Sequence, residues 1–297
     1  MPTLPPHPPA APALPHGDAG AAVGVFDSGV GGLSVLREIR ALLPAQALRY
    51  VADSGHAPYG DKAAQQVQAR AERIIEFLAA QPVQAVVVAC NTVTGLSIQA
   101  LRQRFPQLPL VAIEPAVKPA VAATRSGTVG VLATHNTVHS PGLARLIAAH
   151  AGPVRVLAQA CPGWVEMVER GELDGAASRA AVAACLDPLL AQGADVLVLG
   201  CTHYPFLRPL IEQRAGPGVL VLDPAAAVAR ELLRRLPGAA SNAAPGTTTP
   251  GAAPMAATQT LLGAGCTRFW SSGDCAHASG LISRLWGAPV VAAALPV

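Results

Sequence analysis

Short runs of apolar, β-branched residues alternate along this chain with longer segments in which apolar residues recur every three or four positions. The first run is Val23 to Phe26, and two later runs end at Cys90 and Cys201. Such runs are typical of buried parallel strands. The segments between them, such as Gln65 to Ala79, are typical of helices that cover a sheet. The alternation predicts an α/β fold with mainly parallel sheets covered on both faces.

The predicted elements form two successive series of the same kind, which suggests two pseudo-symmetric three-layer domains. We expect a first α/β domain from residues 22–115 and 225–297, and a second from residues 116–224. We expect strands at 23–26, 48–52, 84–89, 110–113, 128–133, 154–157, 194–199 and 268–270, and helices at 33–43, 65–79, 91–105, 139–151, 165–170, 176–190 and 278–286.

Two segments do not fit this alternation. Residues 1–21 form a proline-rich leader, with seven prolines between Met1 and Gly20. Residues 238–266 lie in a stretch without Asp, Glu, Lys or Arg that is dominated by small residues. Compositions of this kind predict a disordered leader and a flexible insertion.

The composition narrows the class of protein. Of the 297 residues, 51% are hydrophobic and 13% are charged, with a net charge of +3, and no apolar run is long enough to span a membrane. Neither a nucleic-acid partner nor a membrane is expected. The leader lacks the basic start of a signal peptide, so the expected location is the cytoplasm, where the six cysteines would be free thiols.

Cys90 and Cys201 stand out because polar residues follow each of them. Asn91 and Thr92 follow the first, and Thr202 and His203 follow the second. The carboxyl ends of parallel strands are where open α/β sheets bind ligands, and a helix N-terminus there favours a thiolate. A buried packing role explains most free cysteines. The repetition with polar neighbours favours a reactive role here.

Other residues near these cysteines have weaker cases. His203 could be a proton partner of Cys201, and Glu169 could orient that histidine or lie on a solvated helix face. Cys201 and His203 could also supply two metal ligands, but residues two apart at a strand end should diverge, and no metal is expected.

A glycine-rich loop, Asp27-Ser28-Gly29-Val30-Gly31-Gly32, follows the first predicted strand. Its glycines could adopt positive φ and let backbone amides approach an anion. A dinucleotide-binding loop is disfavoured because Ser34 occupies the last glycine position and Asp27 would repel a pyrophosphate. A small zwitterion fits better, with its ammonium near Asp27 and its carboxylate on the amides.

Together, the two cysteine segments, the glycine-rich loop and three further segments resemble the glutamate racemases of the cofactor-independent amino-acid racemase family. The resemblance implies two α/β domains with a buried site between them, and direct use of both thiols without pyridoxal phosphate or another cofactor. The matching segments, in order, are 24–33, 52–54, 58–62, 89–92, 113–115 and 200–205.

Racemisation removes an α-proton from one face and returns a proton to the other, so two bases on opposite faces suit it. By resemblance, Cys90 deprotonates the D-isomer with assistance from Asp27. Cys201 deprotonates the L-isomer with assistance from His203, and Glu169 lies behind that histidine. The substrate contacts that the resemblance implies are Asp27, Ser28, Tyr59, Gly60, Asn91, Thr92, Thr134, Thr137, Thr202 and His203.

The resemblance implies interconversion of L- and D-glutamate, with D-glutamate supplied for peptidoglycan synthesis. An aspartate racemase of the same group is one alternative, and a catalytically idle relative that binds an amino acid or a protein is another. A thiol-redox protein is disfavoured because no cysteines form a CxxC pair. Relatives in this family are often dimers, so a homodimer is the assembly that the resemblance suggests.

Overall fold

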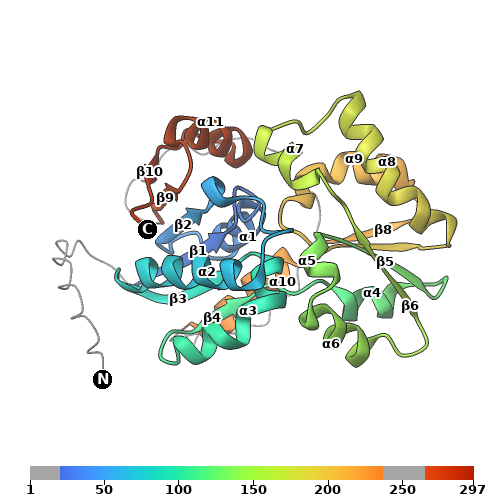
Figure 1. Cartoon of the computed structure of the whole chain (residues 1–297), viewed down its shortest axis with the longest axis horizontal. Coiled ribbons are helices and arrows are strands. Elements are labelled where there is room, and N and C mark those ends of the chain that lie inside the picture. The colour runs from blue at the N-terminus through green and yellow to red at the C-terminus, as the bar shows by residue number, and fades with distance from the viewer. Residues whose placement is uncertain (1–20, 237–264) are drawn as a thin grey trace, which may run out of the picture.

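The computed structural model describes residues 21–236 and 265–297, which contain two parallel β-sheets lying side by side (Figure 1). Residues 1–20 of the predicted leader and residues 238–264 of the predicted insertion lie outside the described residues. The predicted α/β class with parallel sheets is confirmed. The domain boundaries drawn above stay a prediction.

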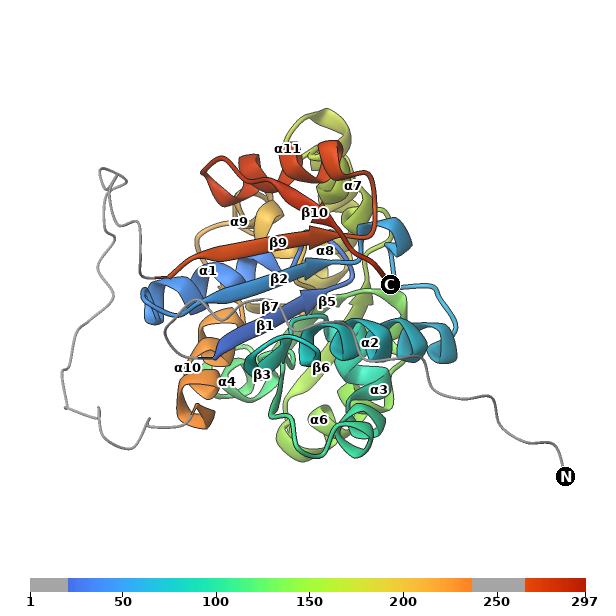
Figure 2. The same cartoon turned by 90° about the vertical axis from the view of Figure 1, so that its left-hand side faces the viewer.

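The first sheet has six strands in the order β10-β9-β2-β1-β3-β4, and every neighbouring pair is parallel. Figure 2 shows β9, β2 and β1 running side by side. The carboxyl ends of β1, β2 and β3 reach the same edge of the sheet, because Asp27 pairs with Ala52 and Phe26 pairs with Val88. The strands are β1 (Ala22–Asp27), β2 (Leu48–Ala52), β3 (Val83–Val88), β4 (Leu110–Ala112), β9 (Thr267–Ser271) and β10 (Ala292–Ala294).

Helices cover both faces of this sheet because its strands are apolar on both sides. Val25 of β1 belongs to a cluster with residues of α1, α10 and α11, and its neighbour Phe26 belongs to a cluster with α2 and α3. Fully buried parallel strands read as continuous apolar runs for this reason. The elements are α1 (Leu33–Leu42), the 3-10 turn η1 (Ser54–His56), α2 (Ala64–Ala79), α3 (Asn91–Arg104), α10 (Ala225–Arg235) and α11 (Cys275–Trp286).

The second sheet has four parallel strands in the order β6-β5-β7-β8. One face packs on α4 and α6, and the other packs on α8 and α9. Its elements are α4 (Val117–Ala123), β5 (Thr128–Ala133), α5 (His135–Val138), α6 (Pro141–His150), β6 (Arg155–Ala160), α7 (Trp164–Arg170), α8 (Ala176–Ala191), β7 (Val196–Leu199), η2 (Tyr204–Leu207), α9 (Arg208–Ala215) and β8 (Leu220–Leu222).

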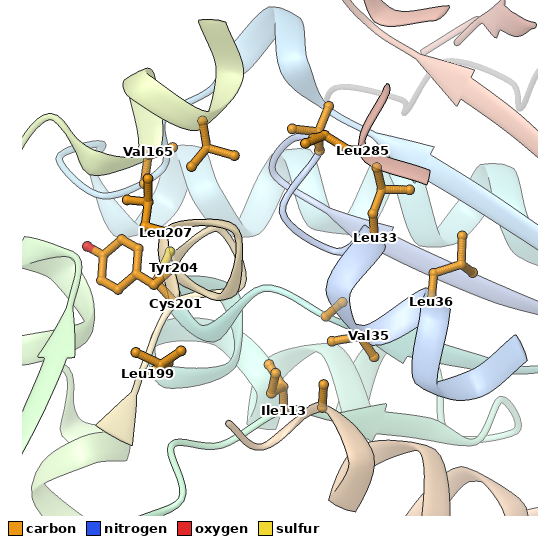
Figure 3. Close-up of a cluster of buried hydrophobic side chains, with 14 of the residues drawn as sticks. Leu33, Val35, Leu36, Ile113, Val165, Leu199, Cys201, Tyr204, Leu207 and Leu285 are labelled. Atoms are coloured by element: carbon orange, nitrogen blue, oxygen red, sulfur yellow. The ribbon is translucent and has the colours of Figure 1, made fainter. Parts of the chain in front are cut away.

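One hydrophobic cluster is continuous between the two sheets. It includes Leu33 and Leu36 of α1, Val165 of α7, and Leu199 of β7 with the neighbouring Cys201 (Figure 3). Burial of a large aliphatic side chain contributes about 1.5–3 kcal/mol. The cluster therefore favours close packing of the two halves around the end of β7.

The backbones of α3 and α6 approach each other where these two helices cross. A Cβ atom placed on Gly142 would lie 2.8 Å from Gly95 Cα, and one on Gly95 would lie 2.6 Å from Ser140 Oγ. Cβ atoms do not tolerate such distances, so both positions need glycine. The contact fixes α3 of the first half directly against α6 of the second.

Most predicted elements occur within a few residues of their expected bounds. The helix expected at 139–151 corresponds to α6, and a short break separates α6 from the preceding helix α5, which was not predicted. The break lies at Ser140, whose hydroxyl caps α6 by accepting a hydrogen bond from Leu143 N, and Pro141 is the first residue of α6. Pro favours the first turn of a new helix because it has no N–H to donate within an existing one.

Candidate active site

A small cavity lies between the two sheets at the carboxyl ends of their strands. β1 and β3 lead into it from the first sheet, and β5 and β7 lead into it from the second. Both halves of the chain therefore contribute to one site, as in other open α/β sheets. The lining residues are Ser28, Tyr59, Gly60, Cys90, Asn91, Thr92, Thr134, Val165, Cys201, Thr202 and His203.

Cys90 reaches the cavity from the first sheet. It directly precedes α3, is 4% exposed, and its Sγ lies 3.6 Å from Ser28 Oγ. Burial raises the pKa of this thiol to about 12, and the nearby Asp27 carboxylate adds to the shift, although the Val93 amide opposes it. Cys90 is therefore a protonated thiol at neutral pH.

Cys201 reaches the same cavity from the second sheet and belongs to a chain of polar groups. Its Sγ lies 3.8 Å from His203 Nδ1, and His203 Nε2 lies 2.7 Å from Glu169 Oε1. Burial by itself lowers the pKa of His203, but hydrogen bonds with Cys201 and Glu169 outweigh it and raise the pKa well above its usual value. His203 is therefore held as an imidazolium beside the Cys201 sulfur.

Glu169, on α7 of the second half, also binds the first half. Its Oε1 accepts a hydrogen bond of 2.7 Å from Val30 N, and its Oε2 accepts one of 3.0 Å from Ser54 Oγ. Of the three hydrogen bonds that this carboxylate forms in the described part of the chain, those to Val30 and Ser54 join the two halves and that to His203 lies within the second half. Contact between the halves therefore fixes the carboxylate that binds His203.

The loop after β1 differs from the expectation that its amides bind a substrate carboxylate. Asp27 Oδ2 accepts hydrogen bonds from Gly29 N at 3.3 Å and Gly32 N at 3.0 Å. Glu169 Oε1 accepts the hydrogen bond from Val30 N. These amides are already satisfied by carboxylates of the protein. Asp27 folds the loop around itself because a buried carboxylate needs hydrogen-bond donors.

Asp27 is fully buried and also accepts a hydrogen bond of 3.1 Å from Thr202 Oγ1 through its Oδ1. Burial raises its pKa, and the neighbouring Glu169 charge raises it further, although His203 opposes both. Asp27 is therefore easier to protonate than an exposed aspartate, which suits a group that assists proton transfer.

The loop glycines make room rather than supply positive φ, since Gly29 and Gly31 are not among the described glycines with φ above zero. A Cβ atom on Gly29 would lie 1.9 Å from Glu169 Oε1, and one on Gly31 would lie 2.3 Å from His203 Nδ1. The glycines are needed because His203 and Glu169 pack directly on the backbone of this loop.

Four polar side chains form the wall between α3 and α5. Thr92 Oγ1 lies 2.9 Å from Thr134 Oγ1 and 3.3 Å from Thr137 Oγ1. Asn91 is 3% exposed, and neither its Oδ1 nor its Nδ2 has a hydrogen-bond partner within the described part of the chain. An unsatisfied buried amide is costly, so Asn91 is the clearest candidate for a direct ligand contact.

Tyr59 is fixed to the first half through its hydroxyl, which donates a short hydrogen bond to Asp53 Oδ2. Asp53 also forms a two-pronged pair with Arg70, at 2.7 and 3.0 Å. Burial alone would raise the pKa of Asp53, but hydrogen bonds from Arg70 and Tyr59 lower it. The Tyr59 ring and the adjacent Gly60 therefore form a fixed part of the cavity wall, with the phenol directed to Asp53.

The structure brings the predicted site residues together. Asp27, Glu169 and Thr137 do not line the cavity themselves but contact residues that do. Val165 lines the cavity and was missed, because an apolar position in an amphipathic helix has the same pattern as a core residue. The catalytic and binding roles of the predicted site residues stay predictions.

Across residues 21–236 and 265–297, no three His, Cys, Asp or Glu side chains gather as a set of metal ligands. Within the same residues, no helix has the length and apolar character needed to cross a membrane.

The sequence is similar to those of bacterial glutamate racemases. A glutamate racemase of Ectopseudomonas mendocina is 51% identical over 267 residues, which cover 90% of this chain and 95% of that protein. A glutamate racemase of Pseudomonas aeruginosa is 49% identical over 269 residues, covering 91% of this chain and 95% of that protein.

Solved structures of glutamate racemases match the fold. The enzyme of Bacillus anthracis has a TM-score of 0.77 at 28% identity, covering 93% of this chain and 98% of that one. The Escherichia coli enzyme, in complex with L-glutamate and the activator UDP-MurNAc-Ala, has a TM-score of 0.75 at 30% identity, covering 93% and 98%. The family model Asp/Glu/Hydantoin racemase matches residues 23–232. The chain therefore belongs to the Asp/Glu/hydantoin racemase family and is an isomerase.

Proposed function

We propose that this protein interconverts L- and D-glutamate by proton transfer at Cα, with Cys90 and Cys201 as the two acid–base groups. The observation that carries the proposal is that the two thiols come from different sheets and line one small cavity. The similarity to glutamate racemases supports glutamate as the substrate.

A two-base reaction needs one thiolate and one thiol at the start of each turnover. In the L-to-D direction, the Cys201 thiolate removes the Cα proton of L-glutamate and the Cys90 thiol delivers its proton to the opposite face. The products are D-glutamate, a Cys201 thiol and a Cys90 thiolate, so protons and charge balance. The reverse reaction uses the same steps in the opposite order.

The surroundings of the two cysteines suit these starting states. His203, held as an imidazolium by Glu169, lies 3.8 Å from the Cys201 sulfur and would offset a negative charge there. Cys90, with a pKa of about 12, carries the proton that the other face requires. The bound substrate's ammonium group would supply a positive charge that stabilises the Cys90 thiolate as it forms and offsets the nearby Asp27 carboxylate.

Substrate binding would use the remaining polar groups of the wall. Asn91 offers both a donor and an acceptor that have no protein partner in the described residues. Ser28, Thr92, Thr134 and Thr202 line the cavity with hydroxyl groups. Such groups can bind the two carboxylates and the ammonium of an acidic amino acid through hydrogen bonds. Tyr59 and Gly60 would close the wall around the substrate, and Thr137 would support it through Thr92.

The biological role that follows is the supply of D-glutamate for peptidoglycan synthesis. The reaction as proposed needs no cofactor, because the thiols provide both proton-transfer steps. A homodimer stays a prediction, which analytical ultracentrifugation of the purified chain would test.

The first experiment is incubation of the purified protein with L-glutamate in D₂O without added cofactor. Optical rotation and NMR of the Cα position are followed together, with L-aspartate in a parallel reaction. Loss of rotation with deuterium entering Cα supports the proposal. Rotation lost only with L-aspartate would instead identify an aspartate racemase. Inert samples with both substrates would support an idle amino-acid-binding relative.

A further inference from the structure

Asn136, on the short helix α5, joins the second half of the molecule to a loop of the first half. Its Nδ2 donates hydrogen bonds to Tyr59 O at 2.9 Å and to Lys62 O at 2.8 Å. Its backbone N donates a third hydrogen bond, of 2.8 Å, to Gly60 O. One residue therefore binds three carbonyl groups of a single loop.

The loop that Asn136 binds forms one wall of the candidate site. Tyr59 and Gly60 both line the cavity. A Cβ atom on Gly60 would lie 3.1 Å from Thr134 Cβ, so the loop backbone packs directly on the start of α5. On its other side, the loop is fixed to the first half by the hydrogen bond of the Tyr59 hydroxyl to Asp53.

The chemistry at this contact requires an amide. The primary amide nitrogen of asparagine carries two hydrogens, which match the two carbonyl acceptors. An aspartate at this position would have no hydrogen to donate and would place a negative charge against carbonyl oxygens. Alanine would leave the two carbonyls without these partners.

We infer that Asn136 is a positioning residue that holds the loop of residues 59–62 against α5 and so closes this wall of the cavity over the substrate. It touches no reacting atom. Its effect on the reaction passes through Tyr59 and Gly60, whose place relative to Thr134 it fixes. Because the bonded groups belong to different halves of the molecule, the same contact favours the closed arrangement of those halves.

The kinetic test compares Asn136→Ala and Asn136→Asp with a control on the same helix, His135→Ala, since His135 is exposed. We expect KM for glutamate to rise about tenfold in both Asn136 variants with kcat within about threefold, because two hydrogen bonds that close the wall are lost. The control should leave both constants unchanged. An unchanged KM, or a loss confined to kcat, would overturn the inference.

A second measurement does not depend on catalysis. Alkylation of Cys90 and Cys201 by iodoacetamide is followed by mass spectrometry at pH 8 in the absence of substrate. Opening of the wall should speed modification of both thiols in Asn136→Ala by about tenfold relative to His135→Ala, as population of an open state increases. Equal rates would contradict the inference.

The kinetic test of this inference rests on the proposed racemase function, and the alkylation test does not. If the unaltered chain does not racemise glutamate, the proposed function fails while the alkylation rates still decide the role of Asn136. If the unaltered chain is active and Asn136→Ala is alkylated at the same rate as His135→Ala, the role assigned to Asn136 fails while the proposed function stands.

Discussion

Replacement of Glu169 by glutamine removes one charge from the candidate site and keeps the shape of the side chain. The amide oxygen of glutamine can accept the hydrogen bonds that His203 Nε2 and Val30 N now give to Glu169 Oε1, each 2.7 Å long. The amide nitrogen can donate to Ser54 Oγ, which now lies 3.0 Å from Oε2. Glu169→Gln therefore tests the charge rather than the contacts.

The size of the effect follows from the difference between charged and neutral hydrogen bonds. A hydrogen bond to a charged group contributes about 1.5–3 kcal/mol and a neutral one about 0.5–1.5 kcal/mol, so the change costs about 1.4 kcal/mol. That energy corresponds to a fall of about one unit in the pKa of His203 and to about a tenfold loss of kcat/KM.

The sign of the pH effect is fixed by the direction of the shift. The pKa of His203 is raised in the folded protein, so the stabilisation from its protonation is complete below the unfolded value and is lost as pH rises through the folded value. With glutamine at position 169, that loss should begin at lower pH, and the alkaline limb of the activity profile should move down by about one unit.

The assay is polarimetry of both reaction directions across the pH range of activity, together with NMR titration of the His203 ring. The two enantiomers have equal free energy in water, so kcat/KM must fall by the same factor in both directions. Ser54→Ala is the matched control, because it removes one hydrogen bond to Glu169 and keeps the charge of the carboxylate. An unchanged alkaline limb and an unchanged His203 titration in Glu169→Gln would refute the assigned role of Glu169.

Three further predictions concern the thiols and the stability of the second half. Cys90→Ala and Cys201→Ala should each abolish racemisation. Cys90→Ala should still exchange the Cα proton of L-glutamate with D₂O, and Cys201→Ala should still exchange that of D-glutamate. Racemisation by either single variant would contradict the two-base scheme. In the substrate-free protein, iodoacetamide should modify Cys90 at pH 8 about a thousandfold more slowly than a thiol of ordinary pKa, because its pKa of about 12 leaves little thiolate; mass spectrometry of the peptide containing Cys90 measures this rate. Asp195 has a pKa lowered to about 2 by hydrogen bonds from Thr124, Arg125 and Ser126, which outweigh its burial. Its stabilisation is present above the unfolded pKa and lost as pH falls towards 2, so urea unfolding should show Asp195→Asn to be less stable at pH 7 by about 1 kcal/mol and less sensitive to acid; equal acid sensitivity would count against this assignment.

Much of the fold could be predicted because buried parallel strands leave a strong hydrophobic pattern. The strand at Thr128–Ala133 has the predicted bounds, and helix α2 begins one residue before its expected start. The strands β8 and β10 were missed: each has three residues, and β10 consists of alanines, which give no strand signal. Helices α4 and α9 were also missed, and both contain proline. Helix α10 was missed although its buried residues recur at helical spacing.

The candidate site could be predicted where residues follow a strand directly, as Cys90 and Cys201 do. The partners of the loop amides could not, because Asp27 turns back onto its own loop and Glu169 arrives from 139 residues away in sequence to bind Val30. Asn136 was missed although it lies between two predicted residues, Thr134 and Thr137. Its acceptors are backbone carbonyls of a distant loop, which leave no trace in side-chain patterns.

The close approach of Gly95 and Gly142 is a direct backbone contact between the two halves of the molecule. Gly95 lies one helical turn beyond Asn91, about 6 Å along α3, so the point of contact between the halves sits next to the site. A methyl group at either position would lie too close to the other helix, so α3 and α6 could not keep their present separation. The closeness of the two halves beside the candidate site is therefore set in part by the hydrogen atoms of two glycines that do not line the cavity.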